Sequence, residues 1–147
     1  MAGASICKPE GRIHGGVKKN SDQLRALVVD DDQSMVSLVI TILQATSIRH
    51  FERALDGSRA VELFEINPNL VDFVICDWNM PGMSGIEVFK RVREINADVP
   101  FLMLTGRSLA NAVTEAVEAG LRHYMKKPFS PDDLQKRVRA MTKPLVI

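Results

Sequence analysis

The sequence predicts a doubly wound α/β domain, in which helices cover both faces of a parallel sheet. Short apolar runs indicate buried strands, and the helical patterns between these runs require the strands to be parallel. Four runs end on polar residues suited to phosphate chemistry: Leu27-Val28-Val29 before Asp30-Asp31, Phe73-Val74-Ile75-Cys76 before Asp77, Phe101-Leu102-Met103-Leu104 before Thr105, and Tyr124-Met125 before Lys126-Lys127. Because parallel strands end at one rim, where open α/β sheets bind ligands, the sequence predicts one site there.

The first half of the domain alternates strands and helices from Leu24 onward. Apolar residues at helical spacing predict a helix over about 33–45: Met35, Leu38, Val39, Ile42 and Leu43. A strand near 48–54 is polar, with His50, Glu52 and Arg53, and is therefore expected at a sheet edge. A helix over 57–66 follows, and the cluster Asn67-Pro68-Asn69 ends it.

The second half shows clear helix start and stop signals. A strand over 72–77 leads into a loop from which Ser84 can start a helix. A strand beginning at Phe101 precedes a helix over about 108–119, with Ser108 as its cap and Gly120 at its end. Ser130 and Pro131 then begin the last helix.

Size and composition favour one soluble domain. The chain has 147 residues, 46% of them hydrophobic, and a net charge of +1, which gives no reason to expect nucleic acid or an anionic membrane as a partner. No run is long enough to span a membrane, so a cytoplasmic location is expected. Residues 1–22 are rich in glycine without an apolar period and are expected to form a flexible arm, with the domain over 23–147. The two cysteines, Cys7 and Cys76, lack metal-like spacing, and Cys76 is expected to be a small buried side chain.

Four motifs occur together, in the order and at the spacing of a known protein family. They are Val28-Val29-Asp30-Asp31, Phe73-Val74-Ile75-Cys76-Asp77-Trp78-Asn79-Met80-Pro81, Leu104-Thr105-Gly106 and Lys127-Pro128-Phe129. Over about residues 24–142 the chain resembles the response-regulator receiver domains, in particular the stand-alone, CheY-like members. The resemblance implies a flavodoxin-like strand order of 2-1-3-4-5. It also implies a role in two-component signalling by phosphorelay, and the segment Asp77-Trp78-Asn79-Met80-Pro81 favours chemotaxis or motility.

Physical chemistry independently favours a phosphoryl and cation site at the predicted rim. Carboxylates that crowd together repel, so they either hold a proton or share a cation, and oxygen ligands of this kind suit Mg²⁺. An aspartate can also accept a phosphoryl group when cations neutralise the charge on its oxygens.

The resemblance assigns a role to each residue of this site. Asp77 is implied to be the phosphoacceptor, Lys127 to pair with the phosphoryl oxygens, and Thr105 to donate its hydroxyl to one of them. Asp30, Asp31 and Asp77, with the backbone carbonyl of Asn79, are implied to bind Mg²⁺.

The resemblance also suggests regulatory positions. Tyr124 matches a switch aromatic that turns inward as Thr105 moves, and the residues alone equally favour a half-buried strand aromatic. Asn79 and Arg107 occupy positions that vary in the family and are expected to set the lifetime of the phosphate by gating water. The Lys127-Pro128 peptide is expected to be cis. Asp32 is better explained as a helix cap, and Asp132-Asp133 as a favourable pair at a helix start.

The preferred interpretation is a phosphoacceptor switch and not an enzyme beyond slow self-phosphorylation and self-dephosphorylation. A histidine kinase or histidine phosphotransfer protein would phosphorylate Asp77, and a surface formed by the fourth helix, fifth strand and fifth helix, about residues 108–142, would then bind a downstream protein. Two alternatives remain open: a haloacid-dehalogenase-type phosphatase that uses Asp30-Asp31-Asp32, and a receiver-like binding module that takes no phosphate.

Overall fold

The computed structural model describes residues 18–106 and 110–147 and contains the predicted parallel sheet. Its strands are β2 (Arg25–Val29), β3 (His50–Ala54), β4 (Phe73–Asp77), β5 (Phe101–Thr105) and β6 (His123–Lys126). All neighbouring pairs are parallel, in the order β3-β2-β4-β5-β6. Counted along the chain this is the order 2-1-3-4-5, which confirms the predicted fold class.

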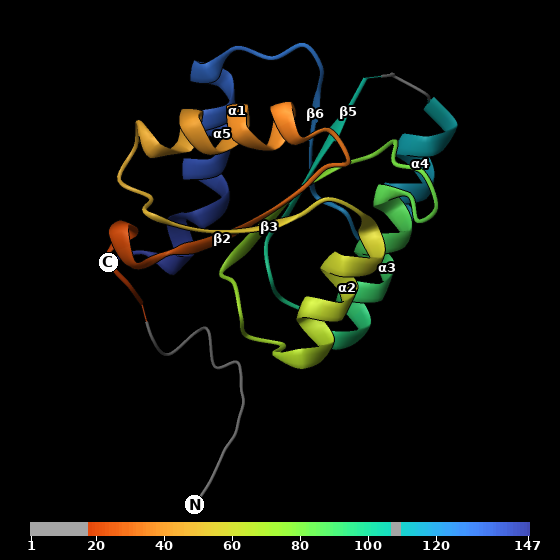
Figure 1. Ribbon diagram of the computed structural model, residues 1–147, viewed down its shortest axis with the longest axis horizontal. Coiled ribbons are helices and arrows are strands. Elements are labelled where there is room, and N and C mark those ends of the chain that lie inside the picture. Colours follow the sequence, from red (N-terminus) through yellow and green to blue (C-terminus); the bar gives the residue numbers. More distant parts are fainter. Residues whose placement is uncertain (1–17, 107–109) are drawn as a thin grey trace, which may run out of the picture.

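Helices cover both faces of the sheet (Figure 1). They are α1 (Gln33–Gln44), α2 (Gly57–Ile66), α3 (Gly85–Ile95), α4 (Ala110–Glu118) and α5 (Pro131–Thr142), with short 3-10 turns η1 (Ser21–Gln23) and η2 (Lys143–Leu145). One apolar core forms between the sheet and the pair α1 and α5, and a second forms beneath α2, α3 and α4. The domain is therefore a three-layer sandwich.

Helix starts follow the capping signals in the sequence. Asp32, Ser84 and Ser130 each accept a hydrogen bond from a backbone N–H in the first turn of α1, α3 and α5. Asp132 and Asp133 lie in the first turn of α5, where negative charge is favourable, as predicted. Gly120 follows α4 with a φ of 100°, a conformation that glycine adopts without strain. The predicted cap Ser108 lies outside the described residues.

The middle strands are buried on both faces. Phe73 and Ile75 of β4 pack toward α1 and α5, whereas Val74 and Cys76 pack toward the opposite helices. This explains the continuous apolar runs that predicted the strands. The polar strand β3 forms one edge of the sheet, as expected.

The two ends of the described chain meet at the amino-terminal ends of the strands. Lys19 forms a parallel bridge with Val146, through Lys19 N to Leu145 O and Ile147 N to Lys19 O, both at 3.0 Å. The Lys19 ammonium also pairs with Asp72 at 3.0 Å. Contacts with the body of the domain therefore begin inside the segment predicted as an arm, while residues 1–17 lie outside the described residues.

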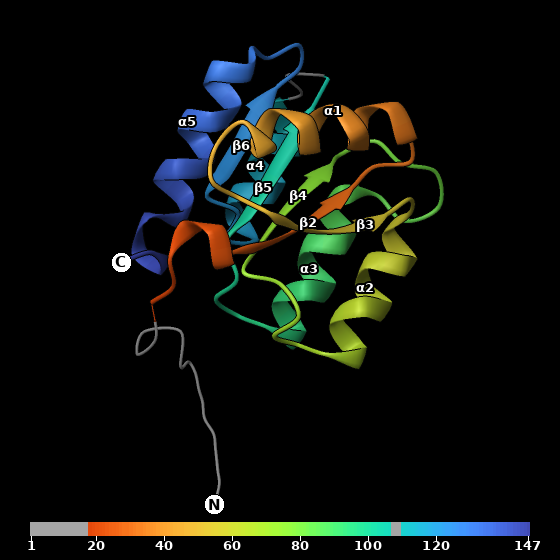
Figure 2. The same cartoon turned by 60° about the vertical axis from the view of Figure 1, so that its left-hand side comes forward.

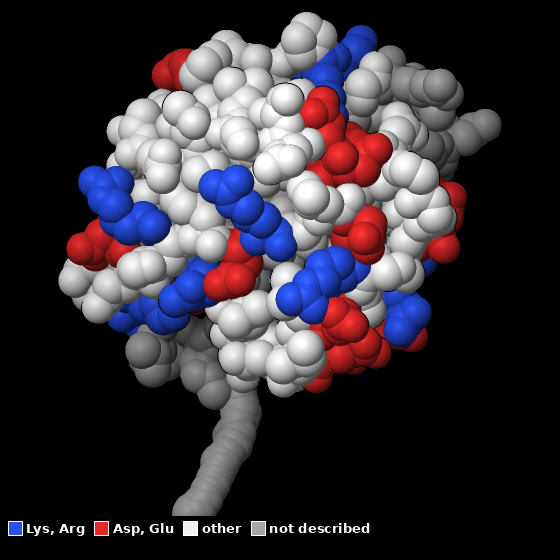
Figure 3. Space-filling model, in the orientation of Figure 1, with Lys and Arg blue, Asp and Glu red and all other residues white. Residues whose placement is uncertain are grey.

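Charged side chains are distributed unevenly over the surface. Helix α1 contains no charged residue, and a broad uncharged area covers its side of the molecule in Figure 3. Acids and bases alternate on the α2 and α3 side, where Arg91 lies near Glu65 and Glu94. No helix within residues 18–106 and 110–147 is long and apolar enough to cross a membrane.

Gly85, the first residue of α3, packs directly against the end of β4. Its N–H donates to the Trp78 carbonyl at 2.8 Å. A Cβ at this position would lie 2.4 Å from the Asp77 carbonyl oxygen and 2.7 Å from the Met103 sulfur. Only glycine lets α3 begin this close to the strand that carries Asp77.

We therefore expect Gly85→Ala to destabilise the domain by about 1–3 kcal/mol, because the methyl group must displace backbone or core atoms. Gly106→Ala is the control, since a Cβ there meets nothing within 4 Å. Denaturant unfolding monitored by circular dichroism measures both variants. Equal stability of the two variants would contradict the close contact.

Candidate functional site

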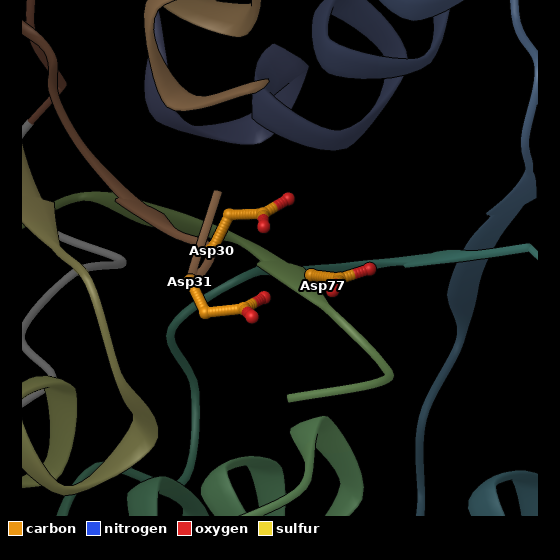
Figure 4. Close-up of side chains that lie close together, drawn as sticks. All are labelled: Asp30, Asp31 and Asp77. Carbon is orange, nitrogen blue, oxygen red and sulfur yellow. The ribbon is translucent and has the colours of Figure 1, made fainter. Parts of the chain in front are cut away.

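Three carboxylates meet at the carboxyl ends of neighbouring strands. Asp30 and Asp31 follow β2 directly, and Asp77 is the last residue of β4, the strand next to β2. One oxygen from each of the three lies within 4.8 Å of the others. Figure 4 shows the three side chains extending in a common direction from the two strand ends. The structure thus brings together acids that are more than 45 positions apart in sequence.

Asp30 is the most electrostatically unusual member of this acidic cluster. Its side chain is buried, with 3% of the residue exposed, and Oδ1 accepts a hydrogen bond from Asp32 N at 2.9 Å. Oδ2 has no hydrogen-bond partner among the described residues. Burial, opposed by the Asp32 N–H and assisted by the charge of Asp77, raises the pKa of Asp30 to about 6.

Lys127 supplies positive charge to the acidic cluster. Its Nζ lies 2.8 Å from Asp77 Oδ1, within hydrogen-bond distance, and 3.7 Å from Asp30 Oδ2. The backbone N–H of Lys127 donates to the Thr105 carbonyl at 2.7 Å, which holds the turn after β6 against the end of β5. The Lys127-Pro128 peptide is cis, as the resemblance implied.

Thr105 is the last residue of β5, beside the end of β4, and only 6% of it is exposed. It therefore lies at the same rim as Asp77. Lys126 is its register partner on β6 but is exposed. The adjacent lysines have different surroundings, because Lys126 ends β6 on the outer surface and Lys127 lies in the following turn at the acidic cluster.

The structure describes two of the three suggested regulatory positions, Tyr124 and Asn79. Tyr124 on β6 is 41% exposed and lines a groove of about 610 Å³ together with Thr105, Phe129 and Arg137. Asn79 is exposed just after β4. Arg107 lies outside the described residues. On α4, Ala116 is buried and Val117 is 52% exposed.

Two polar groups near the cluster have structural explanations. Asp32 caps α1 by accepting from Ser34 N at 2.9 Å, as predicted. Cys76 is fully buried between Val29 and Met103 of the adjacent strands, and this burial raises its thiol pKa well above the ordinary value. The expectation of a small buried side chain at this position is therefore confirmed.

Two features of the site were not predicted from the sequence. The first is that Lys127 is shared between Asp77 and Asp30, because the motif indicated only a cation near the phosphoryl group. The second is the close contact of Gly85 with the Asp77 carbonyl. The pattern of two glycines, Gly82 and Gly85, around a helix start was the available signal for it.

Comparisons with known proteins agree with this fold and acidic cluster. Residues 26–139 match the model of the response regulator receiver domain. Chemotaxis protein CheY-3 of Vibrio cholerae is 33% identical over 117 residues, which cover 78% of this chain and 88% of that protein. An uncharacterized transcriptional regulatory protein of Bacillus subtilis, YrkP, is 43% identical over 116 residues, which cover 79% of this chain and 48% of that protein.

A solved structure supports the same assignment. The chemotaxis protein CheY4 of Vibrio cholerae superposes with a TM-score of 0.72 at 32% identity, covering 80% of this chain and 98% of that one. The family match spans far more than half of the sequence, and both the strand order and the acidic cluster agree with it. This chain therefore belongs to the response regulator receiver domain family.

Proposed function

We propose that this protein is a phosphoacceptor switch of a two-component phosphorelay, in which Asp77 receives a phosphoryl group from a histidine kinase or a histidine phosphotransfer protein. Receiver domains are signalling proteins that bind Mg²⁺ at an acidic pocket and interact with kinases and downstream proteins. The assignment to Asp77, and a cytoplasmic stand-alone regulator as its setting, are our proposals. The contact between Lys127 Nζ and Asp77 Oδ1 at 2.8 Å is the observation that carries the assignment to Asp77.

The geometry suits phosphoryl transfer to a carboxylate. In this step the P–N bond of a phosphohistidine breaks as a bond forms between phosphorus and a carboxylate oxygen of Asp77. Asp77 is 6% exposed, so only a small part of it is accessible to a phosphoryl donor. Lys127 Nζ lies beside the Asp77 carboxylate, so it can pair with the charge that the phosphoryl group would bring. Thr105 lies at the end of the neighbouring strand, where its hydroxyl can donate to a phosphoryl oxygen.

The residues of the acidic cluster fit a divalent cation. Asp30, Asp31 and Asp77 present hard oxygen ligands within 4.8 Å of one another, and the buried Asp30 Oδ2 has no hydrogen-bond partner among the described residues. We infer that Asp31 and Asp77, Asp30 directly or through water, and the Asn79 carbonyl would hold Mg²⁺. When bound, the ion would neutralise charge on the phosphoryl oxygens.

The phosphatase alternative has less support. The third acid of the Asp30-Asp31-Asp32 run caps α1 through Ser34 N, so this carboxylate is engaged in holding the helix start. No observation within the described residues adds the second acidic pair that such an enzyme needs. Phosphorylation experiments distinguish the proposed switch from a binding module that takes no phosphate.

We expect the protein to gain one phosphoryl group on incubation with acetyl phosphate and Mg²⁺, and none after chelation of the metal. Asp77→Asn should abolish the gain, since the amide cannot form an acyl phosphate. Asp132→Asn, an exposed carboxylate on α5, is the control and should be labelled normally. Intact-mass spectrometry with a hydroxylamine-sensitivity check measures each sample. Persistent labelling of the Asp77 variant would overturn the acceptor, and an unlabelled folded parent would favour the binding module.

The adjacent lysines allow a matched comparison. Lys127→Ala should slow phosphorylation by acetyl phosphate about 10- to 100-fold, because the charge that pairs with Asp77 is lost. Lys126→Ala removes the same charge one residue away on the exposed side of β6 and should leave the rate nearly unchanged. Rates from a time course of intact mass decide the outcome. Equal rates for the two variants would show that Lys127 has no special role.

The burial of Asp30, whose Oδ2 has no hydrogen-bond partner among the described residues, predicts a stability effect. Folding raises the pKa of Asp30 from 3.8 to about 6. In the absence of metal, this group therefore does not lower the free energy of unfolding below about pH 4. The free energy of unfolding falls as pH rises through 6, because the buried carboxyl group must then become charged in the folded state. Asp30→Asn avoids this loss, so at pH 7.5 in EDTA it should be more stable than the parent by on the order of 2–3 kcal/mol, and less so at pH 5. Denaturant unfolding at the two pH values tests this.

Asp72→Asn is the control for this effect, because Asp72 is satisfied by Arg25 N and Lys19. This variant should be less stable than the parent at pH 7.5. A loss of stability in Asp30→Asn in EDTA would show that the charge of the buried carboxylate does not destabilise the folded state, and it would contradict the prediction.

A further inference from the structure

A second cavity lies at the end of the sheet opposite to the acidic cluster. It has a volume of about 320 Å³ and lies between η1, the loop from α1 to β3, and the carboxyl-terminal part of α5 with η2. Figures 1 and 2 both show the end of α5 beside η1, near the C-terminus. The cavity is separate from the groove along β6 and shares no lining residue with it.

The floor of this cavity is apolar. Leu24, Ile48 and Val138 are 1%, 5% and 2% exposed and belong to the core beneath α1 and α5. Val146 completes the floor from the terminal segment that pairs with Lys19. Such a floor would contact a hydrocarbon group, while polar side chains line other parts of the cavity: Ser21, Thr46, Ser47, Gln135 and Thr142.

The rim of the cavity carries two cations that pair with no carboxylate among the described residues. Arg139 and Lys143 are exposed, line the cavity and lie four residues apart on one side of the helical end of α5. Within the described part of the chain neither forms an ion pair or a hydrogen bond. The carboxyl-terminal end of a helix favours a cation, but like charges at this spacing repel each other. An anion between the two side chains would relieve the repulsion.

We propose that this cavity binds a small amphiphile with an anionic head group and a hydrocarbon body. The head would lie between Arg139 and Lys143, and the body would rest on Leu24, Ile48 and Val138. The volume is near the lower end of the range for small-molecule sites, so the cavity fits a complete small ligand better than part of a macromolecule. The inference does not depend on phosphorylation of Asp77.

The test uses the full chain and octanoate as the probe. Titration followed by amide chemical shifts should move Ser47, Arg139 and Thr142, with little change at Asp77. Octyl phosphate should bind in the same place if the head group can be either anion, and the ratio of the two affinities distinguishes carboxylate from phosphate ligands. Neutral octanol should bind at least tenfold more weakly than octanoate, because it lacks the charge-assisted contacts.

Variants separate the two cations from general surface charge. Arg139→Gln and Lys143→Gln should each weaken octanoate binding about tenfold. Arg137→Gln, an exposed cation of the same helix that lines the other groove, should leave the affinity unchanged. Absence of octanoate binding to the folded parent, equal affinity for octanol, or the same loss in all three variants would each overturn the proposal. Phosphorylation by acetyl phosphate, measured in parallel, tests the proposed function separately.

Discussion

The rim depends on one electrostatic constraint, the burial of two carboxylates beside each other at the ends of neighbouring strands. Asp30 and Asp77 are 3% and 6% exposed, and Asp31 adds a third negative charge within 4.8 Å. Lys127 is the one cation that pairs with these acids among the residues the structure covers. Three carboxylates against one ammonium leave an excess of negative charge, and two of the three, Asp30 and Asp77, are poorly hydrated. Burial is the main cause of the raised pKa of Asp30, and the charge of Asp77 adds to it. A divalent cation would remove the excess, and a phosphoryl group would need both the cation and Lys127.

The rest of the fold holds these charges in position. Strands β4 and β5 are buried along their whole length, so the backbone that carries Asp77 and Thr105 is held between the two apolar cores. Gly85 fixes the start of α3 against the Asp77 carbonyl, and Asp32 fixes the start of α1 two residues after Asp30. The acidic cluster is thus mounted on rigid elements, whereas Tyr124 and Lys126 lie on the exposed edge strand beside it. This separation suits a site whose chemical state is to be communicated to an outer surface.

The sequence predicted the elements well because each had a local signal. Apolar runs located the strands, and caps such as Ser84 and Ser130 located helix starts to within a residue. The strand order came from the resemblance, since local patterns do not encode which strands are neighbours. Contacts that depend on tertiary distance were missed: the sharing of Lys127 by two acids, the close approach of Gly85, and the pairing of Lys19 with Val146. The exposure of Tyr124 also depends on packing that an aromatic residue in a strand does not reveal.

The most direct test of the electrostatic account is anomalous diffraction from crystals of the protein grown with Mn²⁺ in place of Mg²⁺. Both ions prefer oxygen ligands, and Mn²⁺ gives a signal that identifies its position without reference to any assumed site. The account predicts one strong peak in contact with the carboxylates of Asp31 and Asp77, beside Asp30. A well-ordered crystal with no peak at the acidic cluster, or with manganese bound only elsewhere, would contradict it.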